Sequence, residues 1–241
     1  QHFPKFILNS NNIYMLILWL GTNDLQFQYD IKAHDIEKGL ENLIKLAKTK
    51  TENIIIIPPV ILNENILKGS DICKYRSKDT DNYITFEPDN FQQVAPVEYY
   101  RAPEKLLYRF ICNQLVFAYD NKQTLSLNSC NILIPTLEGV DIKYIMAILN
   151  SRIAQFIYKK KFNSVKVLRS HIEHIPIPKI STDEQKNIIK YINKLLIPME
   201  DKDTILVYNE LDNEIRLLYS LNDSDYSTIK KAVDEDNKFL T

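Results

Sequence analysis

Glycine is scarce in this sequence, which has 241 residues and only 4 glycines. Loops that cradle phosphates use several closely spaced glycines, because only glycine lets the backbone approach the phosphate oxygens. The sequence therefore argues against a dinucleotide-binding loop, a nucleoside-triphosphate loop and any other glycine-rich cofactor loop.

Cysteine is also rare, with 3 residues and no CxxC pair. A structural zinc site needs closely spaced thiolates or histidines. His171 and His174 have the spacing of a metal-binding pair, but Pro176 would interrupt a helix carrying both, and no third ligand cluster is nearby. We expect reduced thiols, a cytoplasmic protein and no metal site.

The sequence has no excess of either charge, since 30 Lys and Arg side chains oppose 31 Asp and Glu side chains. Binding to a polyanion must therefore depend on local clusters of cations. Its apolar run at residues 13–20 is about half as long as a membrane span, so no membrane partner is expected. The chain begins at Gln1 without an initiator Met, which predicts a piece of a longer protein.

Residues 1–62 contain the pattern of a βαβ unit. Residues 13–20 and 53–57 are continuously apolar, which is typical of strands buried in a parallel sheet. Residues 33–48 between them have apolar side chains at helical spacing. Two parallel strands joined by a helical crossover are the expected structure.

The pattern changes in residues 63–241, which we expect to form a second domain. Short segments rich in Tyr, Phe, Ile and Val at 83–86, 115–119 and 129–134 favour a mixed or antiparallel sheet. Helical patterns follow, at residues 141–156, 182–196, 204–218 and 223–234. Ser181 and Glu184 have the spacing of a capping box at the start of one helix. The predicted fold class is α+β, with an N-terminal βαβ unit, a central mixed sheet and a helical C-terminal third.

Residues 144–180 contain the most informative motif, YIMAILNSRIAQFIYKKKFNSVKVLRSHIEHIPIPKI. A helical pattern ends at Asn150-Ser151, resumes through aromatic residues into three lysines, and closes on Ile-Pro-Ile-Pro. Three shorter motifs accompany it: ILKGSDI at 66–72, NSCNI at 128–132, and ELDNEI at 210–215 followed by LYSL. In order and spacing these motifs resemble the TaqI-like C-terminal specificity domain of type II adenine-N6 DNA methyltransferases and restriction-modification enzymes, over about residues 66–233. Ser220 stands where that family usually has glycine.

This resemblance implies recognition of a target sequence in double-stranded DNA, by a module that is not catalytic by itself. A methyltransferase or nuclease domain would lie upstream in the parent chain or in another subunit. The sequence has no Asn/Asp-Pro-Pro-Tyr/Phe motif, so S-adenosylmethionine is expected only in that other domain. Acid-x-Lys triplets begin at Asp30 and Asp141, but neither has an upstream acid that would complete a nuclease site.

Candidate DNA-binding residues are cations that hold phosphates or reach base edges. Three adjacent lysines, at 159–161, repel one another unless an anion neutralises them, and are assigned to phosphates. Arg76, Arg101 and Arg109 are candidates for bidentate contacts to guanine. The predicted set consists of Lys68, Lys74, Arg76, Lys78, Arg101, Lys105, Arg109, Lys122, Lys159, Lys160, Lys161, Lys166 and Arg169, with Arg152 as a further cation.

A second resemblance covers residues 18–59. The motif LGTNDL at 20–25, after a buried strand, resembles the third conserved block of SGNH (GDSL-like) hydrolases. It implies Gly21 and Asn23 as oxyanion-hole donors. The nucleophile and base of that family are missing, because the chain contains no Gly-Asp-Ser and its last histidine is His174. Two alternatives therefore remain: an incomplete SGNH-type esterase, and a helical module that docks a partner subunit.

Overall fold

The computed structural model describes residues 13–19, 33–57, 64–162 and 164–234, and the chain divides into two compact units, Gln1–Leu62 and Asn63–Thr241. Gly21, Asn23 and the triplet that begins at Asp30 lie outside the described residues. No helix of the described residues is both long and apolar enough to cross a membrane.

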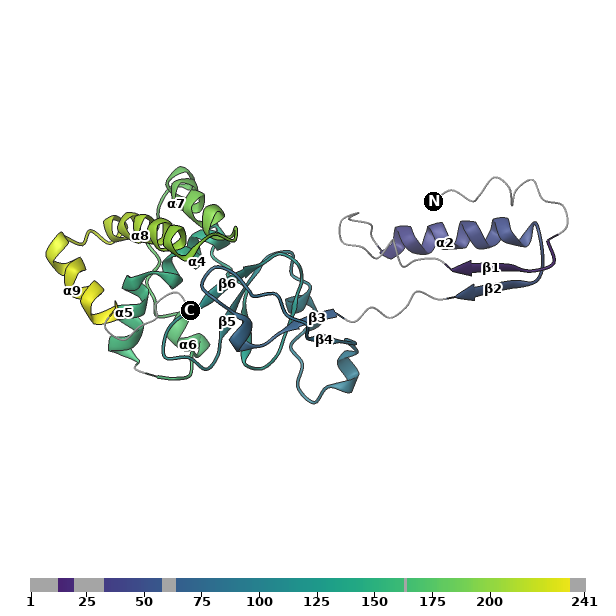
Figure 1. Cartoon of the computed structure of the whole chain (residues 1–241), viewed down its shortest axis with the longest axis horizontal. Helices are drawn as coiled ribbons and strands as arrows, with labels where there is room; N and C mark the ends of the chain where they lie inside the picture. Colours follow the sequence, from purple (N-terminus) through teal and green to yellow (C-terminus); the bar gives the residue numbers. More distant parts are fainter. Residues whose placement is uncertain (1–12, 20–32, 58–63, 163, 235–241) are drawn as a thin grey trace. The chain divides into compact units, whose positions relative to one another are not determined.

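The smaller unit contains β1 (Leu16–Trp19), α2 (Ala33–Lys48) and β2 (Ile54–Ile57) (Figure 1). β1 and β2 pair in parallel, with Leu16 opposite Ile54. Leu16 and Ala47 are buried together, so α2 packs against the strand pair. The predicted strand–helix–strand pattern is confirmed.

The larger unit contains two small sheets, of order β4-β3-β7 and β6-β5-β8. β5 is antiparallel to both of its neighbours, whereas β3 pairs with β7 in parallel. The elements of this part are β3 (Glu64–Leu67), η2 (Gly69–Asp71), β4 (Tyr83–Ile84), η3 (Pro88–Asn90), α3 (Val97–Tyr100), β5 (Lys105–Arg109), β6 (Phe117–Asp120), β7 (Leu125–Ser126) and β8 (Cys130–Leu133).

The helical part follows the strands, and confirms the α+β fold class (Figure 1). Its elements are α4 (Ile142–Asn150), α5 (Arg152–Lys161), α6 (Arg169–Ile172), α7 (Thr182–Leu195), α8 (Asp201–Leu218) and α9 (Asp223–Asp234). The capping box predicted at the start of α7 is present: the Ser181 hydroxyl accepts a bond from the Glu184 amide at 3.3 Å, and the Glu184 carboxylate accepts one from the Ser181 amide at 2.8 Å.

The helical pattern at residues 141–156 forms two helices in the structure, divided at the Asn150-Ser151 interruption that the sequence indicated. Ser151 has extended backbone angles between α4 and α5, and its hydroxyl donates to the Ile148 carbonyl at 2.7 Å. The same oxygen accepts a bond from the Ala154 amide at 3.1 Å and so caps α5. The chain can change direction here because the Ser151 hydroxyl bonds to a free carbonyl at the end of α4 and to a free amide at the start of α5.

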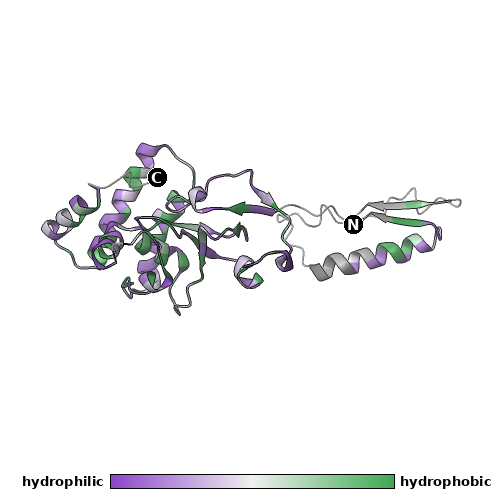
Figure 2. Ribbon diagram, turned by 90° about the horizontal axis from the view of Figure 1, so that it is seen from below, coloured by the Kyte–Doolittle hydropathy of each residue, from purple (hydrophilic) through white to green (hydrophobic). Residues whose placement is uncertain are grey.

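α4 is the centre of the larger unit. It contacts β5, β6, α5 and α7, and every residue from Tyr144 to Asn150 is buried. Its hydrophobic core extends through the sheet β6-β5-β8 and helices α5, α7, α8 and α9. Figure 2 shows strands that are largely hydrophobic and helices of mixed hydropathy, as expected for helices with one face on a core.

Candidate nucleic-acid interface

The larger unit has a cleft of about 850 Å³ next to its two sheets. The segment that contains η3 and α3 lines one part of it, and Tyr108 of β5 and the β7–β8 segment line another. The lining is aromatic, aliphatic and uncharged polar, and its residues include Phe86, Phe91, Gln92, Gln93, Val94, Tyr99, Tyr100, Tyr108, Ser126, Asn128 and Asn131.

Aromatic contacts fix the segment that contains η3 and α3. The Phe86 ring lies 6.1 Å from Phe91 and 5.3 Å from Tyr100, edge to face. The Tyr100 hydroxyl accepts a bond from the Ala95 amide at 3.3 Å. The Arg101 guanidinium lies 5.5 Å from the centre of the Phe86 ring. This wall of the cleft is therefore held by packing before any ligand arrives.

Gly69 holds the opposite side of the cleft. Its amide donates to the Ser129 hydroxyl at 3.0 Å, and a Cβ at this position would lie 2.5 Å from the Ser129 carbonyl oxygen. Only glycine permits so close an approach of two backbones. The contact fixes the loop that presents Asn128, and it places the exposed Lys68 beside that loop.

The amide side chains of the cleft are available to a ligand. Gln92, Gln93 and Asn128 are exposed, and within the described part of the chain no protein group hydrogen-bonds to their amides. Asn131 makes one long hydrogen bond, from its Nδ2 to the Tyr108 hydroxyl at 3.4 Å. Reasoning from sequence concentrated on cations and missed these residues, although the run of aromatic and amide residues at 83–100 was a usable signal.

Arg169 lies beside the aromatic side of the cleft. Its side chain is exposed and forms an ion pair with Glu173 at 2.6 Å. The hydrogen bond and charge of Glu173 raise the pKa of the Arg169 guanidinium, and weaker electrostatic interactions with Tyr99 and Tyr108 raise it further. Lys166 is also exposed, and its backbone bridges to Ile111, two residues beyond β5. Arg169 is therefore brought near the cleft, whereas the backbone bridge anchors Lys166 beside the segment that follows β5.

The three adjacent lysines end α5, but they are not equivalent. Lys159 is half-buried and donates to the Ala232 carbonyl at 3.2 Å. Lys160 and Lys161 are exposed, with their ammonium groups each 5.7 Å from a ring centre, of Phe156 and Phe162 respectively. Lys160 and Lys161 are therefore presented to solvent from an anchored helix end.

Three of the predicted cations are buried, and their assignment to DNA is wrong. The Lys74 ammonium donates to the Asn150 carbonyl at 2.9 Å, and burial lowers the pKa of Lys74 well below its usual value. Lys105 pairs with Asp120 at 2.6 Å. Arg152 pairs with Asp212 and with Asp234. A phosphate cannot reach these groups without opening the core.

The remaining predicted cations are partly engaged or distributed over other loops. Arg101 forms a bidentate pair with Glu64, of which one contact measures 2.7 Å, and Arg109 Nε donates to the Ile72 carbonyl at 2.7 Å. Arg76 is half-buried, whereas Lys78 and Lys122 are exposed. Arg101 is therefore engaged by a carboxylate of the protein, and the Nε of Arg109 supports a backbone carbonyl.

Neither histidine of the H-x-x-H pair has a metal-like environment. The His171 ring stacks on Phe162 with 4.4 Å between ring centres, and His174 Nδ1 lies 2.6 Å from the Ser170 carbonyl. No group of three or more potential metal ligands occurs among the described residues.

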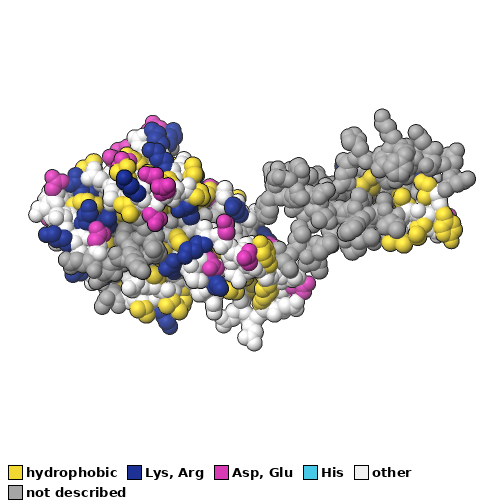
Figure 3. Space-filling model, in the orientation of Figure 1, with side chains coloured by type: hydrophobic (Ala, Val, Ile, Leu, Met, Phe, Trp, Pro, Cys, Tyr) yellow, Lys and Arg dark blue, Asp and Glu magenta, His cyan; other side chains and the backbone are white. Residues whose placement is uncertain are grey.

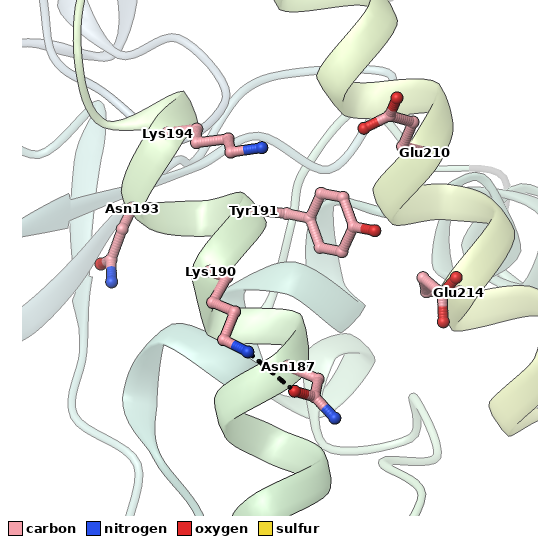
Figure 4. Close-up of a pocket in the computed structure, with 7 residues that line it drawn as sticks. All are labelled: Asn187, Lys190, Tyr191, Asn193, Lys194, Glu210 and Glu214. Carbon is pink, nitrogen blue, oxygen red and sulfur yellow. Dashed lines mark hydrogen bonds between the residues drawn. The ribbon is translucent and has the colours of Figure 1, made fainter.

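A second hollow, of about 660 Å³, lies between α7 and α8. In Figure 4 the Tyr191 ring points from α7 towards α8, which carries Glu210 and Glu214, and Lys190 donates to Asn187 at 3.2 Å. Two lysines and two carboxylates line this hollow, so it has no excess of positive charge that would attract phosphate. Figure 3 likewise shows Lys and Arg interspersed with Asp and Glu on the visible face, so cations are clustered only locally there.

Residues 64–177 match the family model of the TaqI-like C-terminal specificity domain. This segment is therefore similar to the specificity domain of that family, as its motifs predicted, and the family indicates DNA target recognition in a restriction-modification system. The match includes the cleft, Lys166 and Arg169, and it ends before α7. No curated protein matches the chain.

Proposed function

We propose that the larger unit recognises a duplex DNA target on behalf of an adenine-N6 methyltransferase or a fused restriction enzyme. The observation that supports this most strongly is the match of residues 64–177 to the TaqI-like specificity domain. The structure adds a preformed cleft with free hydrogen-bonding groups and exposed cations near it.

The proposed interface uses two kinds of group, one that contacts phosphates and one that contacts base edges. Lys160, Lys161 and Lys166 contact phosphates, because each is an exposed ammonium on a fixed backbone. Such contacts set the position of the protein on the duplex without selecting a sequence. Selection of the sequence requires groups that reach base edges, and the cleft supplies them.

We also propose that this chain does not transfer methyl groups by itself. The motif that holds a flipped adenine is missing from its sequence, as is a glycine-rich cofactor loop. Isothermal titration of the chain with S-adenosylmethionine should give no binding heat. Micromolar binding would contradict the proposal.

Salt dependence tests the proposed DNA contact. The chain should bind duplex DNA weakly, with a Kd of ~10⁻⁴ to 10⁻⁶ M, and affinity should fall as salt rises because counterions are released from the phosphates. Fluorescence anisotropy of a labelled duplex at several salt concentrations measures both quantities. Binding that does not change with salt would contradict a phosphate-contacting surface.

A matched pair of variants locates the contact. Lys160→Ala/Lys161→Ala should weaken binding to all sequences alike and reduce the slope of log affinity against log salt by about 2, one per phosphate. Lys190→Ala/Lys194→Ala removes two exposed lysines of α7, one of which also lies over an aromatic ring, and should leave the slope unchanged. If both double variants lost DNA affinity equally, Lys160 and Lys161 would act only through the net charge of the protein.

A further inference from the structure

Amide side chains line the cleft, whereas the sequence predicted arginines as the groups that contact bases. We propose that the cleft recognises adenine of an A·T base pair, through the side chains of Gln92, Gln93 and Asn128. This inference rests on the proposed function and specifies which base the specificity domain selects.

The hydrogen-bonding pattern of an amide side chain matches adenine. An amide has an NH₂ donor and a carbonyl acceptor side by side. In the major groove adenine presents an acceptor at N7 and a donor at N6, so one amide can satisfy both. Gln92 and Gln93 come from the segment after η3 and Asn128 comes from the β7–β8 loop, so amides from two segments face the same space.

Guanine presents two acceptors, N7 and O6, and is matched by arginine or lysine. The arginines beside the cleft are not among the residues that line it. Arg101 forms a bidentate pair with Glu64, and Arg169 forms an exposed ion pair with Glu173, which is weak. Arg109 follows Tyr108 in β5, so the two side chains point to opposite faces, and its Nε donates to the Ile72 carbonyl. The described residues that line the cleft include amides but neither arginine nor lysine, and the lining therefore favours adenine over guanine.

The apolar lining suits the thymine of the same pair. Val94 is 39% exposed and Tyr99 is 46% exposed, and both line the cleft. An apolar side chain in the major groove can contact the thymine methyl group, which cytosine lacks. Phe86 and Tyr100 hold this segment in place, so the apolar contacts and the amides keep a fixed spacing.

Selection from a random duplex library tests the inference on the intact chain. The enriched sequences should contain A·T pairs at fixed positions. In Gln92→Ala/Gln93→Ala or in Asn128→Ala, preference at one or more of these positions should fall by about 10- to 100-fold, the effect of losing one bidentate base contact. The control Asn213→Ala, at an exposed asparagine of α8 outside the cleft, should select the parent sequences.

A modified base identifies the contact. Replacing the selected adenine by 7-deazaadenine removes the N7 acceptor and should weaken binding by the parent chain but not by the amide variant responsible for that position. The inference is overturned if the parent selects sequences that none of the cleft variants changes, or if its selected positions are G·C pairs sensitive to 7-deazaguanine. In both cases DNA binding persists and the proposed function stands. A chain that binds no duplex at low salt fails the proposed function itself, and the inference with it.

Discussion

Lys105 illustrates how single residues decide which cations can meet DNA. Its ammonium is inaccessible to solvent and pairs with Asp120, fifteen positions away. In the sequence Lys105 is indistinguishable from exposed lysines such as Lys122, because its partner is brought to it only by the pairing of β5 with β6. Lys160 and Lys161 could be predicted, since a run of lysines at a helix end favours solvent.

Breaking the Lys105–Asp120 pair should destabilise the larger unit. Asp120→Asn leaves a buried ammonium without its counter-charge, at a cost of about 3–5 kcal/mol in the free energy of unfolding. Urea denaturation followed by circular dichroism measures the change. Lys122→Ala, in the same turn, is the control and should stay within about 0.5 kcal/mol of the parent. A loss below about 1 kcal/mol for Asp120→Asn would show that water reaches the pair.

Cys130 should make the stability of the protein fall at alkaline pH. Burial, helped by the charges of Asp71 and Asp120, raises the pKa of its thiol to about 12. The folded chain therefore keeps a proton that the unfolded chain releases near pH ~8.5, so the contribution of this thiol is complete below that pH and is lost as the pH rises towards 12.

The variant Cys130→Ala separates this effect from the titration of buried tyrosines, because the parent and the variant contain the same tyrosines. The free energy of unfolding should fall less in the variant than in the parent between about pH 8.5 and 10.5, as measured by urea titrations at each pH. Parallel curves for the two proteins would mean that the thiol does not contribute.

Among the elements, the junction of α4 and α5 shows what the sequence could and could not indicate. The small polar pair Asn150-Ser151 indicated an interruption there, and the structure has one. The sequence could not show that Asn150 turns its amide to β6. Its Oδ1 accepts from the Phe117 amide at 3.0 Å and its Nδ2 donates to the Phe117 carbonyl at 2.9 Å.

Asn150→Ala should therefore loosen the contact between α4 and β6. It leaves the Phe117 amide buried without a partner, at about 1–3 kcal/mol, whereas the Phe117 carbonyl still accepts a bond from the Tyr75 amide at 2.7 Å. Thermal unfolding should show a lower Tm, with Asn213→Ala as an exposed asparagine control. A Tm equal to that of the parent would mean that water replaces the amide.

The strands were predicted less completely than the helices, for a physical reason. The helices α2, α7, α8 and α9 have regular apolar spacing and were predicted nearly to their ends. β5 was missed because its first four residues, including a lysine, are all buried, so it lacks the alternation that identifies a half-exposed strand. The cleft was missed for a related reason, since the residues that line it are brought together only by the folded chain.

At the scale of the whole molecule, the matched segment is not a complete folding unit. Helices α7 to α9 lie beyond residue 177 but share its hydrophobic core. The Arg152 amide donates to Asp212 of α8 at 3.0 Å, and Arg152 Nε donates to Asp234 of α9 at 2.8 Å. Asp212 is fully buried and also accepts bonds from Tyr208 and Tyr226.

Two truncations test this dependence. Residues 63–241 alone should fold and unfold in one cooperative transition, because both of their hydrophobic clusters are formed within that range. Residues 64–177 alone should not fold, because Arg152 loses its buried partners and α4 and α5 lose their cover. Circular dichroism and limited proteolysis distinguish the outcomes, and a cooperative transition in the shorter fragment would contradict the prediction.

The buried pair of Arg152 and Asp212 also constrains how sequence specificity can be exchanged between related genes. A recombination breakpoint where the family segment ends would join an arginine from one parent to helices from another, and would leave an unmatched charge in the core unless both parents had kept the pair. A breakpoint beyond α9 transfers both residues together. Hybrid enzymes with new target sequences should therefore arise most readily when the C-terminal helices are inherited with the specificity domain as one cassette.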